Sequence, residues 1–168
     1  MNMNKITKYT ITTAREDVIL LEEAGEYHVF LSEPGAEVSL RGAFDISGND
    51  ICHVKVVIHH KAPHTRASTM LRGVGRDQSK ITFEGRIIID KDCGDSNSFL
   101  TERIILLSDQ AKAEAIPDLE ILTDDVKCSH AASISRIPED HLFYLMSRGI
   151  PKQQAEDMIV EGFLSLED

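Results

Sequence analysis

Cys128 and His130 stand two residues apart in the segment DDVKCSH, behind the aspartate pair Asp124 and Asp125. In an extended strand, residues i and i+2 project from the same face, roughly 6 to 7 Å apart. A thiolate and an imidazole at that separation can bind one metal ion, with bond lengths of about 2.0 to 2.3 Å. Two ligands do not complete a metal site, so another strand, a second chain or a bound partner must supply the rest. The alternative is that Cys128 is a small buried apolar residue and His130 its hydrogen-bonded neighbour.

The aspartate pair also has two interpretations. Paired carboxylates can bind a hard cation. They more often form turn and cap hydrogen bonds where a loop enters a strand. We therefore expect Asp124 and Asp125 to form a turn.

Three histidines gather in the segment IHHKAPHT, namely His59, His60 and His64. His59 and His60 are adjacent, so in a strand they face opposite sides and do not easily bind one ion. His60 and His64 lie on either side of Pro63, where spacing does not determine their geometry. A histidine metal site in this segment is therefore the minor alternative.

The three cysteines, Cys52, Cys93 and Cys128, are an odd number at wide spacings, which does not predict a disulfide framework. Cys93, in DKDCGDSN, is predicted to lie exposed in a turn, where Lys91 is the only basic neighbour that would lower its pKa. We assign it no role. The chain contains no GxSxG motif, no phosphate-binding glycine loop and no HExxH motif. The sequence therefore predicts no enzymatic activity.

Composition limits the classes of function. The 168 residues suffice for one domain with a substantial core, and their content is 42% hydrophobic and 27% charged. The net charge of -10 argues against binding to nucleic acid or to an anionic membrane surface. No apolar run approaches the roughly 18 residues of a membrane span, and the N-terminus lacks the apolar region of a signal peptide. We expect a cytoplasmic protein.

The first 120 or so residues predict an all-β body. Eight segments are rich in β-branched and aromatic residues, and several of them alternate with a period of two. Glycine and proline breaks separate the segments, and no amphipathic helix interrupts them. This pattern leaves a sandwich, a barrel and a solenoid open. The segments are YTITT, DVILLE, EYHVFLS, AEVSLRG, HVKVVIHH, ASTMLRGV, KITFEGRIIID and ERIILLSD.

Composition changes after Ile137, where PEDHLFYLMSRG predicts a first helix. Acidic residues follow Pro138 in the first turn, and Gly149 is predicted to stand just past the C-terminus of this helix. Pro151 then opens a second helix, so the chain ends in an αα-hairpin. We therefore divide the chain into a β domain, residues 1–137, and a helical segment, residues 138–168.

Several motifs follow one another in the later part of the chain, namely LLSD, P-D-LEI, DDVKCSH, FYL-SRGI and the terminal GF, with HHKAPHTRAS and RGVGRDQSKITFEGRIII upstream. With these motifs the C-terminal third resembles the end of the SufB/SufD family, the scaffold subunits of the SUF iron–sulfur cluster assembly machinery. The resemblance covers roughly residues 50 to 164 well and the first 50 loosely. It implies a right-handed parallel β-helix followed by a short helical segment, and so selects the solenoid.

The resemblance also implies a function and partners. Family members act as a SufB–SufD heterodimer or as homodimers, and they bind the ABC-type ATPase SufC through the C-terminal helical region. Nascent iron–sulfur clusters form at or near the subunit interface. Transferred to this sequence, the resemblance makes Cys128 and His130 cluster or metal ligands. It also makes the segment around the motif FYL-SRGI a partner-binding site, with the residues Phe143, Tyr144, Arg148 and Gly149.

Two positions depart from the SufB pattern. Ala111 stands where SufB-type members carry a cysteine, and Ala131 follows His130 where they carry a glutamate. The SufB-type ligand set is therefore incomplete, and a SufD-like structural partner without its own cluster is the alternative. A small metal-dependent enzyme of cupin type is a further alternative, although the compact His-x-His and glutamate set on neighbouring strands that it needs is not found.

Overall fold

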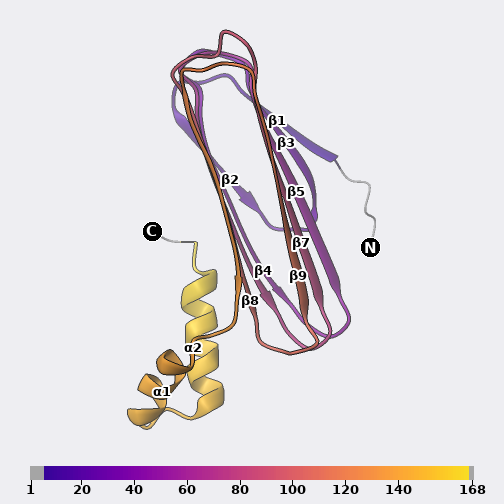
Figure 1. Ribbon diagram of the computed structural model, residues 1–168, viewed down its shortest axis with the longest axis vertical. Helices are drawn as coiled ribbons and strands as arrows, with labels where there is room; N and C mark the ends of the chain where they lie inside the picture. The colour runs from indigo at the N-terminus through magenta and orange to yellow at the C-terminus, as the bar shows by residue number, and fades with distance from the viewer. Residues whose placement is uncertain (1–5, 167–168) are drawn as a thin grey trace.

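A computed structural model describes residues 6–166, which form ten strands and two helices (Figure 1). The strands are β1 (Ile6–Ile11), β2 (Glu16–Leu21), β3 (Gly25–Leu31), β4 (Glu37–Ile46), β5 (Ile51–His60), β6 (Arg66–Gly75), β7 (Lys80–Ile89), β8 (Ser96–Leu106), β9 (Lys112–Ile121) and β10 (Val126–Ser135). The helices are α1 (Glu139–Ser147) and α2 (Lys152–Leu164).

The strands form two parallel sheets that face each other. Sheet A has the order β1-β3-β5-β7-β9, and sheet B has the order β10-β8-β6-β4-β2. Every pairing is parallel, and consecutive strands alternate between the sheets, so each turn of the chain adds one strand to each sheet. This is a parallel β-solenoid followed by two helices, as the resemblance implied.

Each of the eight segments predicted from the sequence overlaps one of the strands β1 to β8. Two differences matter for the site. Strand β8 begins at Ser96, six residues before the predicted segment starts, and β9 had no predicted counterpart. Strand β9 contains Pro117, which cannot donate to a strand ladder and therefore suits an edge strand. It is indeed the edge of sheet A.

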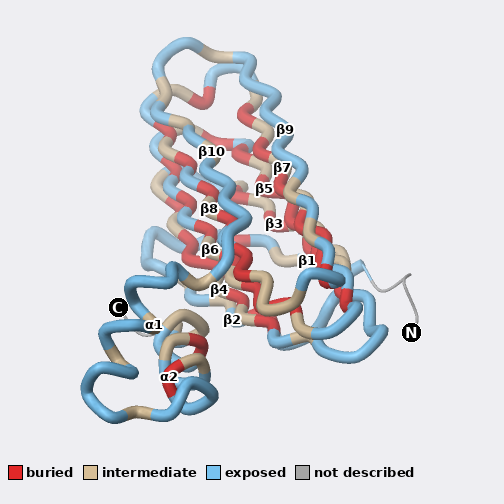
Figure 2. Tube along the Cα trace, turned by 60° about the horizontal axis from the view of Figure 1, so that its bottom comes forward, coloured by how far each residue is buried: buried red, intermediate tan, exposed pale blue. Residues whose placement is uncertain are grey.

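Inward-facing apolar side chains fill the space between the sheets. Alternate residues of each strand point inward, and stacking places them in rows along the solenoid axis. The largest fully buried apolar ones are Phe83, Leu31, Leu40, Ile58, Leu71, Ile81, Ile87, Ile89, Leu100 and Ile104. Burial ends at the last turn, where β9 and β10 are mostly exposed (Figure 2).

The two helices form the predicted hairpin. Gly149 has φ 86°, and the N–H of Ile150 donates to the carbonyl of Leu145 at 3.3 Å, so the expected glycine termination is confirmed. Helix α2 packs on the outer face of sheet B, where Val160 joins Val74 and Ile105 in one apolar cluster. Neither helix within residues 6–166 is long and apolar enough to cross a membrane.

Candidate functional site

Cys128 and His130 lie on β10, the edge strand of sheet B in the last turn. Burial alternates along this strand, with Ser129 exposed and its two neighbours partly buried, so Cys128 and His130 share the inward face as predicted. In the strand register Cys128 pairs with Ser98, and His130 pairs with Leu100. Cys128 packs against a small apolar cluster made of Ile87, Ile89, Cys93 and Leu100.

His130 makes a close contact with Glu102 of the neighbouring strand β8. Its Nε2 atom lies 3.0 Å from Oε2 of Glu102, and the two side chains are only 4% and 0% exposed. Burial raises the pKa of the Glu102 carboxyl, and the hydrogen bond from His130 partly opposes that rise. His130 is the described side chain that hydrogen-bonds this buried carboxyl, and it offsets part of the cost of the lost hydration.

The pair leaves two polar atoms without partners. Nδ1 of His130 and Oε1 of Glu102 are buried and form no hydrogen bond with any described residue, and the same holds for the nearby hydroxyl of Ser98. A buried polar atom without a hydrogen bond costs roughly 1 to 3 kcal/mol, so such atoms suit a site that a ligand completes. Within residues 6–166, however, no group of three His, Cys, Asp or Glu side chains converges on one point. The described chain therefore offers at most an incomplete ligand set.

Gly85 of β7 makes room for the imidazole from the opposite sheet. A Cβ atom on Gly85 would lie 2.7 Å from Cε1 of His130 and 2.6 Å from Cδ1 of Leu100. These distances are shorter than real contacts, so a side chain at position 85 would force the His130 ring or the Leu100 side chain to shift.

The histidines of IHHKAPHT do not form a common site. His59 points outward and contacts Asp90 at 2.9 Å, whereas His60 is fully buried and bonds to the Thr65 hydroxyl at 2.6 Å. Their opposite directions are as predicted. His64 lies in the following turn and contacts Asp95 at 2.9 Å.

The prediction that Cys93 is exposed is wrong. Its side chain is 2% exposed, and it belongs to the same apolar cluster as Cys128. The turn folds inward because the solenoid interior continues beneath it, which local sequence does not reveal. Burial raises the pKa of both thiols.

Asp124 and Asp125 occupy the bend before β10, and the carbonyl of Asp125 accepts a hydrogen bond from the N–H of Asp95 at 2.7 Å, which agrees with the turn interpretation.

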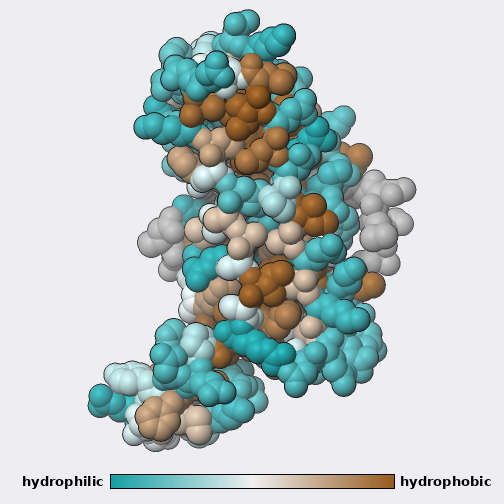
Figure 3. All heavy atoms as spheres, viewed as in Figure 1, coloured by the Kyte–Doolittle hydropathy of each residue, from teal (hydrophilic) through white to brown (hydrophobic). Residues whose placement is uncertain are grey.

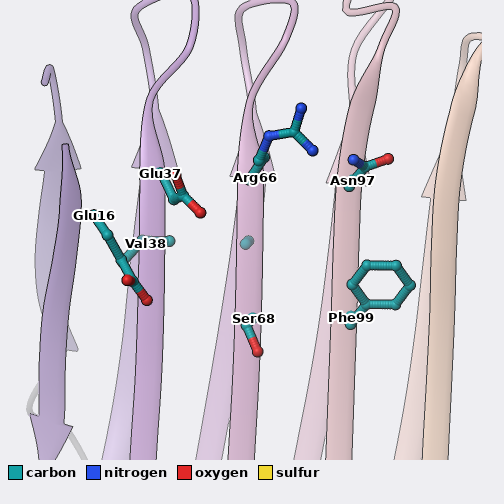
Figure 4. A pocket seen from close by; sticks show the side chains of 8 residues that line it. Glu16, Glu37, Val38, Arg66, Ser68, Asn97 and Phe99 are labelled. Carbon is teal, nitrogen blue, oxygen red and sulfur yellow. The ribbon is translucent and has the colours of Figure 1, made fainter. Parts of the chain in front are cut away.

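A separate shallow cavity of about 170 Å³ lies on the outer face of sheet B (Figure 4). Glu16, Glu37, Arg66 and Asn97 form one row across four strands there, with Phe99 beside them. Side chains on this face point away from the interior that holds His130, so the cavity does not belong to the same site.

A family model for the SUF system FeS cluster assembly SufBD core domain matches residues 23–163. This protein belongs to the SufB/SufD family. It is 31% identical to the iron–sulfur cluster assembly protein SufD of Escherichia coli over 115 residues, which are 68% of this chain and 27% of that protein. It is 37% identical to SufD of Bacillus subtilis over 108 residues, 64% of this chain and 25% of that protein. For SufB of Bacillus subtilis the identity is 31% over 105 residues, 62% and 23% of the two chains.

The matched region spans about a quarter of the length of these SufB/SufD relatives. The family model, over residues 23–163, covers the solenoid turns from β3 onward, α1 and nearly all of α2. The candidate site therefore lies within the part of the chain that the family shares.

The expected partner-binding residues of this SufB/SufD-family chain lie on α1 and the turn after it. Phe143 is 73% exposed, and Tyr144 is exposed as well. The Arg148 guanidinium lies 5.3 Å from the centre of the Tyr144 ring, which is a cation–π distance. Large exposed aromatic side chains on a short helix form a surface suited to a protein partner.

The last turn of the solenoid forms a second apolar surface. Figure 3 views this end of the molecule and shows apolar patches between polar margins. The exposed apolar side chains of β9, β10 and the residue after β9 are Ile116, Leu119, Ile121, Leu122 and Ile134. Both edge strands also leave ladder groups unpaired on their outer side.

Glu102 is the site residue that the sequence interpretation missed. A signal for it exists, because Glu102 is separated by an even number of residues from Ser98, Leu100 and Ile104 of β8, which face inward. Residues at such spacings lie on the same face of a strand. The predicted segment began only at Glu102, so this alternation was not visible within it. A charged residue in an inward position of a strand marks either a buried pair or a functional site.

Proposed function

We propose that this protein is a non-enzymatic scaffold of the SUF iron–sulfur cluster assembly system. Its cargo would be iron or a nascent iron–sulfur cluster, held transiently at His130 with Cys128 nearby. The observation that carries the proposal is the buried contact between His130 and Glu102, which leaves unpartnered polar atoms in the last turn. Imidazole, thiolate and carboxylate are suitable ligands for iron, and imidazole and thiolate hold iron–sulfur clusters.

The proposed scaffold works as a dimer, either with itself or with a SufB- or SufD-type partner. Two observations support pairing through the last turn. Its apolar side chains and strand edges are exposed, and exposed edges favour pairing with another chain. The ligand set in one chain is also incomplete among the described residues, so a second chain would supply what is missing.

The same proposal assigns the helical hairpin to an ABC-type ATPase that resembles SufC. The hairpin is held on sheet B through α2, while α1 exposes Phe143 and Tyr144. An ATPase bound there would leave the last turn free for the second scaffold subunit.

A SufD-like structural partner without its own cluster is the second candidate function. It is favoured by the absence of a three-ligand group within residues 6–166. In that case the chain would complete a site whose main ligands belong to its partner.

Anaerobic reconstitution with ferrous iron and sulfide tests the cargo site. We expect a visible chromophore that weakens in Cys128→Ala and is lost in His130→Ala. His141→Ala, which removes an exposed histidine of α1, is the matched control and should leave the spectrum unchanged. If both site variants keep the native spectrum, these residues do not bind the cargo. A chromophore that forms only when a SufB-type partner is added would select the second candidate.

Affinity purification from the native host tests the ATPase. The native chain should recover an ABC-type ATPase, and the double variant Phe143→Ala, Tyr144→Ala should lose it. Ile51→Ala changes an exposed apolar residue of β5, outside the hairpin, and as a control it should recover the ATPase like the native chain. Equal recovery by the double variant would remove α1 from the binding surface.

A further inference from the structure

The two ring nitrogens of His130 have different surroundings. Nε2 faces the Glu102 carboxyl at 3.0 Å, whereas Nδ1 is buried and forms no hydrogen bond with any residue between 6 and 166. A neutral imidazole carries one proton, and the partner of one nitrogen decides which nitrogen carries it. A carboxylate oxygen accepts hydrogen bonds, so the Glu102 oxygen 3.0 Å from Nε2 favours the proton on that nitrogen.

We propose that Glu102 is a positioning residue that holds His130 in the Nε2–H tautomer and leaves Nδ1 as the atom that binds iron or the cluster. The inference rests on the function proposed above. A carboxylate that orients a ligating histidine in this way also increases the basicity of the free nitrogen. Glu102 would therefore act through His130 and need not contact the cargo itself.

The packing around the ring holds this arrangement in place. Cε1, the carbon between the two nitrogens, lies close to Gly85, where an added Cβ would stand only 2.7 Å from it. Leu100 approaches Gly85 equally closely and fills the space beside the ring. Glu102 comes from β8 and Gly85 from β7, so both sheets limit the directions in which the imidazole can point.

The alternative to this arrangement is the Nδ1–H tautomer of His130. A protonated Glu102 would donate to Nε2, and the imidazole proton would then lie on Nδ1, which could no longer bind a metal. The two arrangements predict opposite protonation of the two nitrogens, so one measurement separates them.

Nitrogen NMR of the metal-free full-length protein near neutral pH tests the tautomer. We expect the His130 ring to show a protonated Nε2 and a bare Nδ1. The signals of His130 are identified among the seven histidines by their disappearance in His130→Gln. A His130 proton on Nδ1 would overturn the proposal, whether or not any variant folds.

Titration with Co²⁺ alone tests the consequence for metal binding, and the absorption of the bound Co²⁺ is the readout. Glu102→Gln preserves the shape of the side chain and removes its charge, and we expect it to weaken Co²⁺ binding about 10- to 100-fold. Glu114→Gln makes the same change at an exposed position of β9 and should bind Co²⁺ like the native protein. An unchanged dissociation constant in Glu102→Gln would refute the role of Glu102.

His130→Ala distinguishes this failure from a failure of the proposed function. If His130→Ala loses Co²⁺ while Glu102→Gln retains it, only the positioning role is wrong. If His130→Ala binds Co²⁺ as tightly as the native protein, His130 is no metal ligand, and the proposed cargo site and the assignment of Nδ1 fall together.

Discussion

Glu102 and Arg103 are consecutive residues of β8, and their side chains lie on opposite faces of sheet B. Glu102 contacts His130 in the interior, whereas the Arg103 guanidinium lies 5.7 Å from the centre of the Phe163 ring of α2. One strand therefore contacts both the candidate site and the helix that anchors the C-terminal hairpin. A displacement of α2 would act directly on the strand that positions His130.

Val160→Ala should loosen α2 from sheet B. Val160 is buried against Val74 and Ile105, and removing two methyl groups costs about 1.5 kcal/mol of docking free energy. We expect faster amide hydrogen exchange in α2, and a smaller increase in β8 around Arg103. Met158→Ala, at an exposed position of the same helix, should exchange like the native protein. Unchanged exchange in Val160→Ala would mean that other contacts hold α2, such as the hydrogen bond from Arg72 to the Phe163 carbonyl.

Gly85→Ala should displace the His130 ring. The new methyl group would stand 2.7 Å from Cε1 of His130, and relieving that overlap costs roughly 1 to 3 kcal/mol of stability. We expect a lower denaturation midpoint in urea together with a changed His130 NMR signal. Gly162→Ala is the matched control, because a Cβ there meets no atom within 4 Å. Replacing this helical glycine should stabilise the protein by about 0.4 to 1 kcal/mol. A native His130 signal in Gly85→Ala would show that the interior accommodates the methyl group.

His60 should make the protein less stable in mild acid. Complete burial lowers its pKa from 6.5 to about 4, with repulsion from His59 as a smaller cause. The unfolded chain therefore binds a proton more readily than the folded one, and stability falls as pH drops from about 6.5 towards about 4. Between about pH 7.5 and about pH 5, the expected loss from this residue is about 2 kcal/mol.

Urea denaturation of the native protein and His60→Gln at the two pH values measures this loss. The variant should lack it, whereas His141→Gln on the exposed face of α1 should keep it. Parallel loss of stability in the native protein and His60→Gln would show that other groups cause the acid sensitivity.

Leu119→Glu should turn the proposed dimer into a monomer. Leu119 is 45% exposed on β9, in the surface proposed to pair two chains, and a charge buried in an interface without a partner is costly. Sedimentation velocity would measure the change, and an unchanged circular dichroism spectrum would show that the fold is intact. Val18→Glu is the control, since Val18 is 59% exposed on β2 at the opposite end of the solenoid. Dissociation by Val18→Glu but not by Leu119→Glu would place the interface at the other end.

The three thiols should react in a defined order. Burial raises the pKa of Cys52 to about 11 and raises those of Cys93 and Cys128, so little reactive thiolate is present near neutral pH. Only Cys128 is partly exposed. We expect an alkylating reagent to label Cys128 first, and Cys52 and Cys93 only after unfolding, as read by peptide mass spectrometry. Labelling of Cys93 as rapid as that of Cys128 would mean that the turn before β8 opens in solution.

Short-range patterns in the sequence were sufficient for much of the fold. β-Branched and aromatic content, with period-two alternation in several segments, marked eight of the ten described strands. The two-residue period of a strand also placed Cys128 and His130 on one face, because this depends only on backbone pleating. Proline and glycine signals likewise placed the helical hairpin and its termination at Gly149. Alternation did not choose among a sandwich, a barrel and a solenoid, since all three bury one face of each strand. The resemblance to a family made that choice.

Only the tertiary structure decided which residues meet. Glu102 lies 28 positions before His130, and Gly85 comes from the other sheet, yet both contact the same imidazole. Such contacts depend on the register between stacked turns, which is set by the packing of the whole interior rather than by nearby sequence. The same reason explains Cys93, which local composition assigned to an exposed turn and the solenoid interior buries. The sequence determined the strands and the directions of their side chains, and stacking of the turns brought a carboxylate to the histidine.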